Sequence, residues 1–389
     1  MKLHNDQPTT SAHLFLSFLR LGLTAFGGPA TIAHIKELSV ERKRWLDEST
    51  YNDGIVLCQS IPGATAMQMA AYVGLKSQGV VGALASYIGF GLPAFILMLA
   101  LSIGYADTHK LSWVVALFSG LQVIIVALVA NATYAFGKAT LKNYKIILLA
   151  AAAAVFFGKG VSPFLVIIGA GLVGACFLSN LGRIPELLSP VKIDKRTYLP
   201  TVTLSAILVA GLITLYITDK ALFPLASLML KIDLFAFGGG FASVPLMLHE
   251  IVEVRGWMDG RTFMDGIALG QVTPGPIIIT STFVGYLLHG VAGAIVATIA
   301  IFTPSFLILA VAVPVFGRLK SSKYFLGITK GIFASFVGLL FFTTLKFALD
   351  VPWDIIRVLL GLASLAALVT KIDIIYVVVV GAIISLLMF

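Results

Sequence analysis

Long apolar runs separated by short polar connections make up most of this chain. In the first half they cover residues 14–32, 52–75, 79–104, 113–136, 144–157 and 161–180. One run follows at 200–217, and six more lie at 223–241, 263–288, 291–316, 331–346, 355–369 and 373–389. Most runs approach the ~20 residues that a helix needs to cross a bilayer, and none alternates as barrel strands do. The pattern predicts an all-α polytopic membrane protein with about 13 transmembrane helices.

The second half of the pattern repeats the first. Phe26-Gly27-Gly28-Pro29 returns as Phe237-Gly238-Gly239-Gly240, and Pro62-Gly63 returns as Pro274-Gly275. The offset between matched residues is 211 or 212 throughout. An internal repeat of this length in so apolar a chain is typical of secondary transporters.

The unpaired run at 200–217 sets the relation between the copies. Six crossings return the chain to its starting side, so a seventh starts the second copy from the opposite side. This predicts two inverted six-helix repeats joined by a linker helix, with broken helices at mid-membrane. The predicted parts are residues 1–13 as a cytoplasmic N-terminus, 14–180 as the first repeat, 181–222 as a basic linker with its connecting helix, and 223–389 as the second repeat. A re-entrant course of one span in both copies would change this parity.

Loop charge gives the expected orientation. With the N-terminus in the cytoplasm, the inner loops hold roughly twice as many Lys and Arg residues as the outer loops, which fits the positive-inside rule. The discordant loop is 33–50, where Lys36, Arg42, Lys43 and Arg44 fall on the outside. We therefore expect a multi-pass protein of the cell membrane, as in the inner membrane of a bacterium, with the lipid bilayer as its surroundings.

Composition supports this class and excludes others. Hydrophobic residues make up 59% of the 389 positions and charged residues 12%, against about 25% charged in soluble domains. The net charge of +9 resides in short loops between spans, so nucleic-acid binding is not expected. Cys58 and Cys176 are far apart, and no metal-ligand spacing, nucleotide motif or catalytic triad occurs. We expect no cofactor, no metal and no enzymatic activity.

The interrupted helices are the candidate substrate site. Proline and glycine break a helix, and such a break at membrane depth is tolerated only where it faces protein or a wet cavity. The helix that resumes after the break offers free amides and a positive dipole end, which suit an anion. The polar residues beside the breaks are Gln59, Thr65 and Gln68 in the first copy and Gln271, Thr273 and Thr280 in the second. The alternative is a kinked helix that serves packing alone.

Charged residues inside the spans are the second group of candidates. Arg20 and Lys231 each stand six residues before a Phe-Gly-Gly motif, at a cost of about 2.5–3.5 kcal/mol for a mid-membrane cation. We expect them to offset the charge of a bound anion, with snorkelling of Arg20 as the alternative. Asp53 and Asp265 also occupy matched positions. They either have a coupling or gating role, in which they bind a proton during transport, or cap a helix N-terminus. Asp233 has no acidic counterpart and could neutralise Lys231.

These motifs resemble those of the chromate ion transporter family in its two-domain, long-chain type. That family has Phe-Gly-Gly-Pro near the end of the first span, Pro-Gly in the second, and the whole pattern twice. The resemblance covers about Leu14 to Phe389 and implies oppositely oriented halves that export chromate, a tetrahedral dianion similar to sulfate. The motif residues that carry over are Phe26, Gly27, Gly28, Pro29, Pro62 and Gly63, with Phe237, Gly238, Gly239, Pro274, Gly275 and Pro276. Shorter relatives work as pairs, so a homodimer is a further expectation.

The resulting prediction is a secondary active transporter of a tetrahedral oxyanion, with chromate efflux first and sulfate second. Without a nucleotide-binding motif, the energy must come from an ion gradient, a counter-anion or the membrane potential. The alternatives are another anion as cargo, an anion channel, or a membrane-embedded enzyme or lipid-phosphate flippase. An enzyme would need titratable groups at the bilayer surface, whereas the matched groups here lie at breaks within the runs.

Overall fold

The computed structural model describes residues 9–25, 28–179, 199–317 and 322–389, and every helix and turn below belongs to these ranges. Within them the regular elements are helices, joined at one point by an isolated β-bridge. Phe26 and Gly27 of the first motif, and residues 181–198 of the predicted basic linker, lie outside the described residues.

The helices follow the predicted runs, with more interruptions. The first half contains α1 Ser11–Thr24, α2 Gly28–Lys36, η1 Glu37–Arg42, α3 Glu48–Ser60, α4 Thr65–Thr108, α5 Ser112–Thr140, α6 Tyr144–Gly158 and α7 Pro163–Phe177. After α8 Leu199–Thr218, the second half contains α9 Leu222–Phe235, η3 Gly240–Ala242, α10 Ser243–Met247, η4 Leu248–Val254, α11 Gly260–Val272, η5 Ile277–Ile279, α12 Thr280–Ala312, η6 Val313–Val315, α14 Lys323–Asp350, α15 Ile355–Val369 and α16 Ile374–Met388. Helices α5, α6 and α7 begin 211 residues before α14, α15 and α16.

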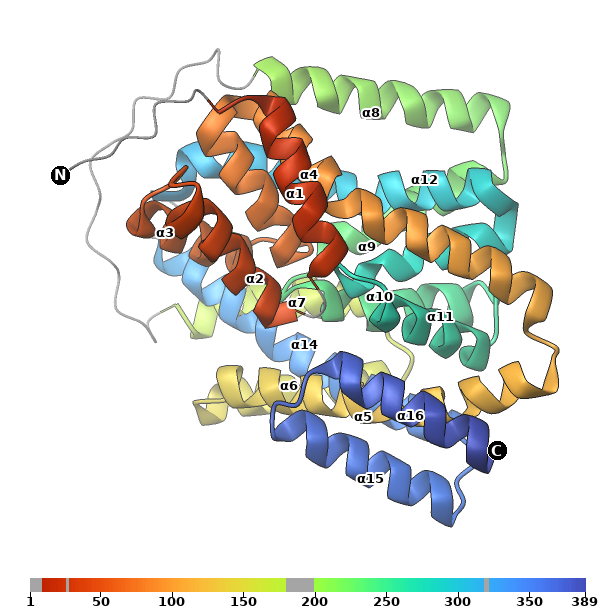
Figure 1. Ribbon diagram of the computed structural model, residues 1–389. Coiled ribbons are helices and arrows are strands. Elements are labelled where there is room, and N and C mark those ends of the chain that lie inside the picture. Colours follow the sequence, from red (N-terminus) through yellow and green to blue (C-terminus); the bar gives the residue numbers. More distant parts are fainter. Residues whose placement is uncertain (1–8, 26–27, 180–198, 318–321) are drawn as a thin grey trace.

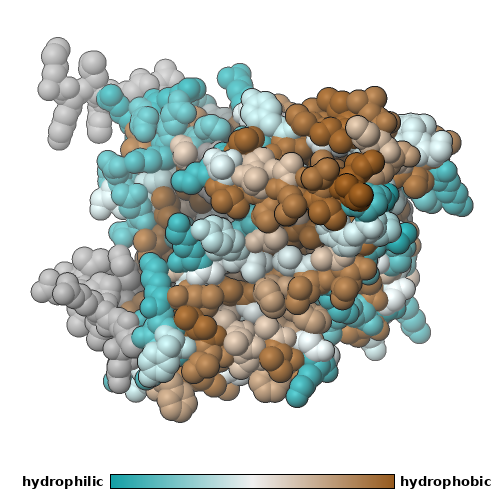
Figure 2. All heavy atoms as spheres, turned by 90° about the horizontal axis from the view of Figure 1, so that it is seen from below, coloured by the Kyte–Doolittle hydropathy of each residue, from teal (hydrophilic) through white to brown (hydrophobic). Residues whose placement is uncertain are grey.

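Five of the described helices are long and apolar enough to cross a membrane, namely α4, α5, α8, the helix through α12, and α14. The shorter apolar helices α6, α7, α15 and α16 have 15 residues each, or about 22 Å of length at the usual helical rise. Figure 2 shows apolar side chains over the middle of one face and many of the hydrophilic ones toward its left and right margins. These features are those of a multi-pass membrane protein.

The run predicted at 14–32 is a helical hairpin and not a straight span. After α1 the chain turns and returns through α2 and η1. The Nζ atom of Lys43 lies 3.2 Å from Nε2 of His13 near the start of α1, and the Trp45 ring stacks on Phe18 at 6.2 Å between centroids. The end of η1 is therefore beside the beginning of α1.

The run predicted at 52–75 is a second hairpin. The hydroxyl of Tyr72 on α4 donates to the backbone oxygen of Thr50 on α3, 3.1 Å away. A Cβ atom on Gly54 would meet the Tyr72 ring at 2.5 Å, so glycine lets the two arms come together. The second half repeats this contact between Gly266 and the ring of Phe283.

A sharp turn then separates the second hairpin from a long helix. Gly79 has φ +64° and Gly290 has φ +60°, a left-handed conformation that favours glycine, and each divides a helix in two. On either side of the first turn the segments pack closely, since the Ser86 hydroxyl donates to the Ala70 oxygen at 2.7 Å. In the second half, Lys231 on α9 pairs with Glu250 on η4, so its first two arms also lie side by side. Each repeat therefore has two hairpins followed by long helices.

The two halves are intertwined. Helix α5 packs against α15 and α16, and its counterpart α14 packs against α6 and α7 (Figure 1). Thr133 on α5 and Thr344 on α14 occupy matched positions, and their hydroxyl oxygens lie 3.2 Å apart. A residue that contacts its own counterpart lies close to the axis that relates the two copies.

Candidate functional site

The tips of the hairpins from the two halves meet inside the protein. We name them the first tip (Ala25, the described residue after α1), the second tip (61–64), the third tip (236–239) and the fourth tip (273–276). The amide of Gly63 donates to the Ala236 oxygen at 2.9 Å, and the amide of Gly275 donates to the Ala25 oxygen at 3.0 Å. Gly275 is the counterpart of Gly63, and Ala236 is the counterpart of Ala25. Each bond is therefore the repeat of the other, with the donor and acceptor halves exchanged.

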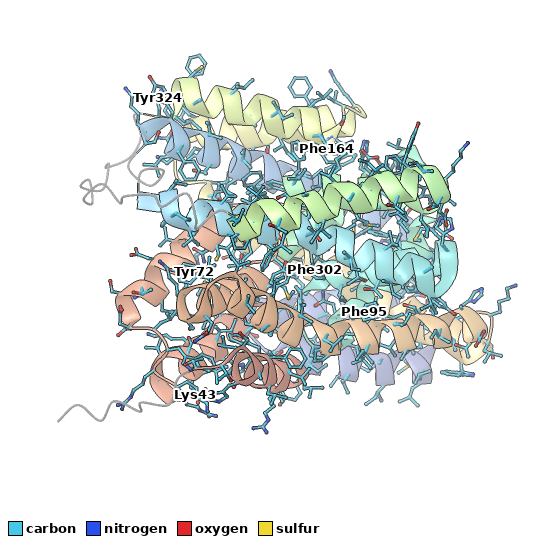
Figure 3. The ribbon with its side chains drawn as sticks, turned by 90° about the horizontal axis from the view of Figure 1, so that it is seen from above. Lys43, Tyr72, Phe95, Phe164, Phe302 and Tyr324 are labelled. Carbon is cyan, nitrogen blue, oxygen red and sulfur yellow. The ribbon has the colours of Figure 1, made fainter. Side chains whose placement is uncertain are left out.

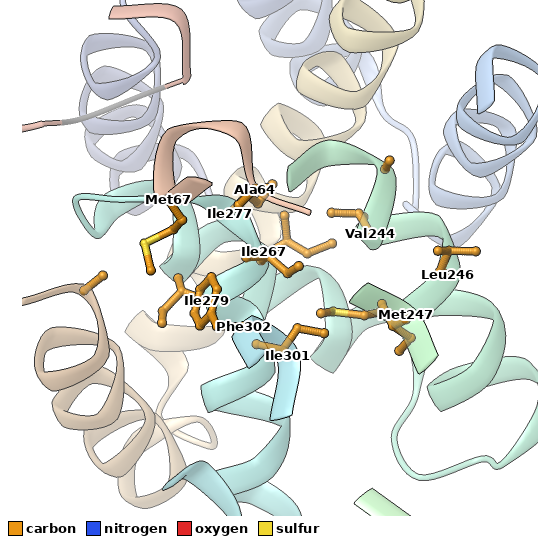
Figure 4. Packing of buried hydrophobic residues seen from close by; sticks show 14 of the residues in the cluster. Ala64, Met67, Val244, Leu246, Met247, Ile267, Ile277, Ile279, Ile301 and Phe302 are labelled. Atoms are coloured by element: carbon orange, nitrogen blue, oxygen red, sulfur yellow. The ribbon is translucent and has the colours of Figure 1, made fainter. Parts of the chain in front are cut away.

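Further contacts tie the tips into one cluster. Pro62 and Phe237 form an antiparallel bridge between the second and third tips. A Cβ atom on Gly240, directly after the third tip, would lie 3.0 Å from the Ile277 side chain, directly after the fourth. Figure 4 shows Ala64 and Met67 of the first half close to Ile277 and Ile279 of the second.

Glycine is required at the second, third and fourth tips by its backbone conformation, and at the second tip also by the space available. Gly63 has φ +114° and its counterpart Gly275 has φ +106°, while Gly238 and Gly239 have φ +97° and +92°. A Cβ atom on Gly63 would also stand 2.2 Å from the Cβ atom of Ser305. The glycines that the motifs singled out thus allow the tips to turn and to approach α12.

Helices begin directly after the tips, and their first amides are left without side-chain caps. Helix α4 starts at Thr65, and neither its N-cap residue Ala64 nor Pro276 before η5 makes a side-chain hydrogen bond. The first amides of a helix have no partner within it, and the helix dipole adds positive charge there. The cluster of tips therefore offers donors suited to an anion.

Of the predicted polar residues, some lie at the tips and others do not. Gln68 is buried, and its Nε2 atom donates to the Pro62 oxygen. Thr65 is half-buried, with Oγ1 3.5 Å from a Cβ atom built on Gly239. Gln59 is exposed.

The counterparts in the second half are more enclosed. Gln271 is half-buried, as are Gly275 and Pro276, while Pro274 is buried. The hydroxyls of Thr273 and Thr280 donate to the backbone oxygens of residues 270 and 277 at 2.9 and 2.8 Å. These two threonines therefore satisfy turns of their own helices in this conformation.

The two matched cations have different surroundings. Arg20 is exposed, so the structure does not bring its side chain to the tips. Lys231 donates to Oε1 of Glu250 at 2.8 Å and lies 3.7 Å from the ring centroid of Phe164, while Arg255 is 3.4 Å from the other Glu250 oxygen. Glu250 is only 5% exposed and is the partner of Lys231, a role that the sequence had suggested for Asp233.

The matched acids Asp53 and Asp265 also differ. Asp265 is 7% exposed, and its two oxygens accept from the Tyr105 hydroxyl and from Nε2 of Gln122, both at 2.8 Å. Both donors come from the first half, so this carboxylate joins the halves. Asp53 is half-buried.

Neither acid caps the helix to which it belongs, because other acids occupy the two N-cap positions. Asp47 precedes α3 and accepts from the Thr50 amide at 2.8 Å, and Asp259 precedes α11 and accepts from the Thr262 amide at 2.9 Å. The backbone hydrogen bond from Thr50 lowers the pKa of the Asp47 carboxyl below its ordinary value.

A buried polar group that the sequence did not assign to the site lies behind the second tip. Asp233 is fully buried, and its Oδ2 atom accepts from the Ser305 amide at 2.7 Å. The hydroxyl of Tyr87 donates to the Phe302 oxygen at 2.8 Å and is 3.3 Å from Oγ of Ser305. The sequence feature that could have pointed to this group is that Asp233 lies inside an apolar run and has a glycine, Gly22, as its counterpart.

A cavity of about 960 Å³ lies between α8 and the helices α4, α9 and α12. Its wall is apolar and includes Phe95 and Phe302, which come from α4 and α12 in Figure 3. Met67, two residues into the first turn of α4, also lines it. A wall of this chemistry suits hydrocarbon better than an oxyanion, so the cavity is not the candidate site.

Long apolar helices, an internal repeat, and hairpin tips that meet in the interior define a polytopic membrane transporter. The chain belongs to the chromate transporter family, because the family model described as chromate transporter matches residues 12–175 and again residues 223–386. Within the described residues no group of His, Cys, Asp or Glu side chains could hold a metal ion.

Several relatives resemble this chain over nearly its full length. An uncharacterized transporter of Methanocaldococcus jannaschii is 43% identical over 99% of this chain and 96% of its own length. Chromate transport proteins of Cupriavidus metallidurans and Pseudomonas aeruginosa are 28% and 30% identical, over 94% and 92% of this chain and 90% and 86% of their own lengths. No solved structure gives a significant match.

Proposed function

We propose that this protein is a secondary active transporter of a tetrahedral oxyanion, with chromate efflux as its first activity and sulfate as the second candidate. The observation that carries the proposal is the pair of reciprocal bonds between tips of the two halves, Gly63 to Ala236 and Gly275 to Ala25. They gather uncapped helix starts at one place inside the protein. Two relatives that match most of the chain are named chromate transport proteins.

The hairpins support an inverted arrangement of the halves by a route other than the predicted one. Each repeat has two hairpins, and a hairpin enters and leaves on the same side, so neither changes the parity. Four helices then cross in each repeat, and α8 crosses alone between them. We propose nine crossings and four hairpins in place of 13 spans, with the copies related by a pseudo-two-fold axis in the membrane plane.

The arrangement with hairpins also explains the basic residues of loop 33–50, which straight spans would place on the outside. If α1, α2 and η1 form a hairpin, the segment holding Arg42, Lys43 and Arg44 lies on the same side as the N-terminus. Those basic residues then join the cytoplasmic group, as the positive-inside rule expects. The orientation with a cytoplasmic N-terminus is therefore better supported by the hairpins than by straight spans.

In the proposed site the backbone contributes most of the binding. Amides at the starts of α4 and η5, with Thr65 and Nε2 of Gln68, supply donors to the oxyanion. Lys231 is 44% exposed and paired with Glu250, so we assign it to the electrostatics of the entrance. Arg20 and Gln59 stay outside the site in this conformation.

The magnitudes are compatible with alternating access. A hydrogen bond contributes about 0.5–1.5 kcal/mol net, so separating the tips costs little. Moving one charge through the membrane potential is worth about 2.3 kcal/mol per 100 mV, and a dianion moves two. For a dianion that crosses without a cation, an outside-positive potential therefore favours export by more than parting the two tip bonds costs.

The test is uptake of radiolabelled chromate into proteoliposomes, with sulfate as competitor and with or without trapped counter-anion. We expect saturable uptake that sulfate competes and that depends on the counter-anion or the potential. Flux that rises in proportion to chromate without saturation would indicate a channel. No chromate or sulfate flux above that of empty liposomes would refute the proposal.

A further inference from the structure

A fully buried carboxylate behind the second tip has no assigned role. Asp233 has 0% exposure near the end of α9, and one of its oxygens accepts from the Ser305 amide. Its other oxygen, Oδ1, has no hydrogen-bond partner among the described residues. A buried acceptor without a donor costs free energy, and a proton on that oxygen would convert it into a donor.

The charges around Asp233 do not neutralise it. Lys231, two residues earlier, is paired with Glu250 on η4. Among the described residues of the other packed helices, the titratable group beside it is Tyr87 of α4, and α12 contributes Ser305, which is not titratable. An ionised carboxylate in this place would stand in a low dielectric without a cation, which is expensive.

The first half shows that the fold itself does not need this acid. At the positions equivalent to Asp233 and Ser305 it has Gly22 and Ala94. One contact around them is matched, because a Cβ atom on Gly275 would lie 3.0 Å from the Cβ atom of Ala94, as one on Gly63 would lie 2.2 Å from that of Ser305. The same position in the fold is therefore filled by residues without a charge in the first half and by an acid in the second.

Asp233 is also tied to the proposed oxyanion site. The second tip sits directly on Ser305, whose amide binds the carboxylate. The amide of Gly63 in the same tip binds the oxygen of Ala236, three residues after Asp233. A movement of the second tip therefore changes the surroundings of the carboxylate.

We infer that Asp233 is a proton-binding site that links oxyanion transport to protons. The inference rests on the proposed function and adds the coupling ion and its residue. A neutral Asp233 removes a negative charge from beside the tip, so a proton bound there favours the dianion, and the two are carried together. In the sequence this role was expected of Asp53 and Asp265, and Asp265 is already held by Tyr105 and Gln122.

The experiment compares the wild type with Asp233→Asn in proteoliposomes that contain a trapped pH-sensitive dye. The asparagine imitates the neutral acid, so we expect chromate exchange to be retained, while the proton movement that accompanies net chromate flux is lost. A proton carried on chromate itself would appear equally in both proteins. The matched control is Asp219→Asn, whose carboxylate caps the start of the same helix, and it should behave as the wild type.

Two outcomes overturn the inference while the proposed function stands. One is chromate transport by the wild type without proton movement, and the other is unchanged proton movement in Asp233→Asn. If Asp233→Asn does not fold, the double variant Asp233→Gly with Ser305→Ala is measured in its place. It carries the residues that the first half has at these positions, Gly22 and Ala94.

Infrared spectroscopy tests the proton site without transport. We expect a carboxylic-acid carbonyl band that titrates with pH in the wild type and is lost in Asp233→Asn. If no chromate or sulfate flux is seen, the proposed function fails and this band alone decides whether Asp233 binds a proton. A wild-type spectrum without such a band contradicts the inference.

Discussion

Glycines at the tips allow backbone turns that other residues would adopt only with strain. Gly63 is the clearest case, since its φ of +114° and the nearness of Ser305 both exclude a side chain. The sequence predicted which glycines and prolines interrupt the helices, because the repeat marks them twice. It did not predict Glu250 as the partner of Lys231, and it gave that role to Asp233. Neither acid has an acidic counterpart in the first half, so the repeat did not point to where each one lies.

Gly63→Ala is expected to reduce oxyanion transport about tenfold or more. The new methyl group would collide with Ser305, and the backbone strain alone is worth about 1–3 kcal/mol, where 1.36 kcal/mol is a factor of ten. The measurement is chromate uptake per inserted protein. Gly104→Ala in α4 is the matched control, because a Cβ atom there meets nothing within 4 Å. Equal loss in both variants would contradict the tip's special role.

Asp265→Asn is expected to lower the stability of the folded protein. Both carboxylate oxygens accept hydrogen bonds, and the amide would place a donor against Tyr105 or Gln122. Leaving a buried group unsatisfied costs about 1–3 kcal/mol. The midpoint of thermal unfolding in detergent should fall, whereas the exposed Asp107→Asn should leave it unchanged. An unchanged midpoint in Asp265→Asn would show that the link between the halves is not stabilising.

Among the elements, the hairpins are what the sequence did not predict. Hydropathy detects apolar length, and two short helices joined by a tight turn have the same apolar length as one interrupted span. The breaks at Pro62 and Pro274 were predicted correctly, but the reversal of direction depends on tertiary contacts such as Tyr72 with Thr50. The caps at Asp47 and Asp259 were the available local signal that new helices begin there.

Labelling of Arg44→Cys separates the hairpin from the straight span. In a background without Cys58 and Cys176, we expect a membrane-impermeant thiol reagent to reach this cysteine from the side that also reaches Thr10→Cys. Straight spans place the two residues on opposite sides, since one crossing separates them. Labelling from opposite sides would rule out the first hairpin.

At the scale of the whole molecule, the repeat produces an intertwined pair of halves. Helix α5 packs on α15 and α16, and α14 packs on α6 and α7, so neither half buries its helices alone. Motif offsets predicted the repeat, and loop charge gave the expected membrane sides. The intertwining was not, because both halves have the same pattern and the sequence does not say which copy supplies a neighbour.

The most direct test of convergent tips is a reversible cross-link between them. Pro62 and Phe237 are bridge partners, and bridged residues have Cα atoms about 4.5–5.5 Å apart, within disulfide range. In a background without Cys58 and Cys176, Pro62→Cys with Phe237→Cys should form a disulfide on oxidation. Each single variant is the control.

We expect chromate transport by the double variant to stop when the disulfide forms and to return on reduction, while neither single variant responds to oxidant. The reason is that the second and third tips must separate for the site to change sides. Undiminished transport with the disulfide fully formed, or failure of these two cysteines to form one, would contradict a transport site built from the meeting tips of the two halves.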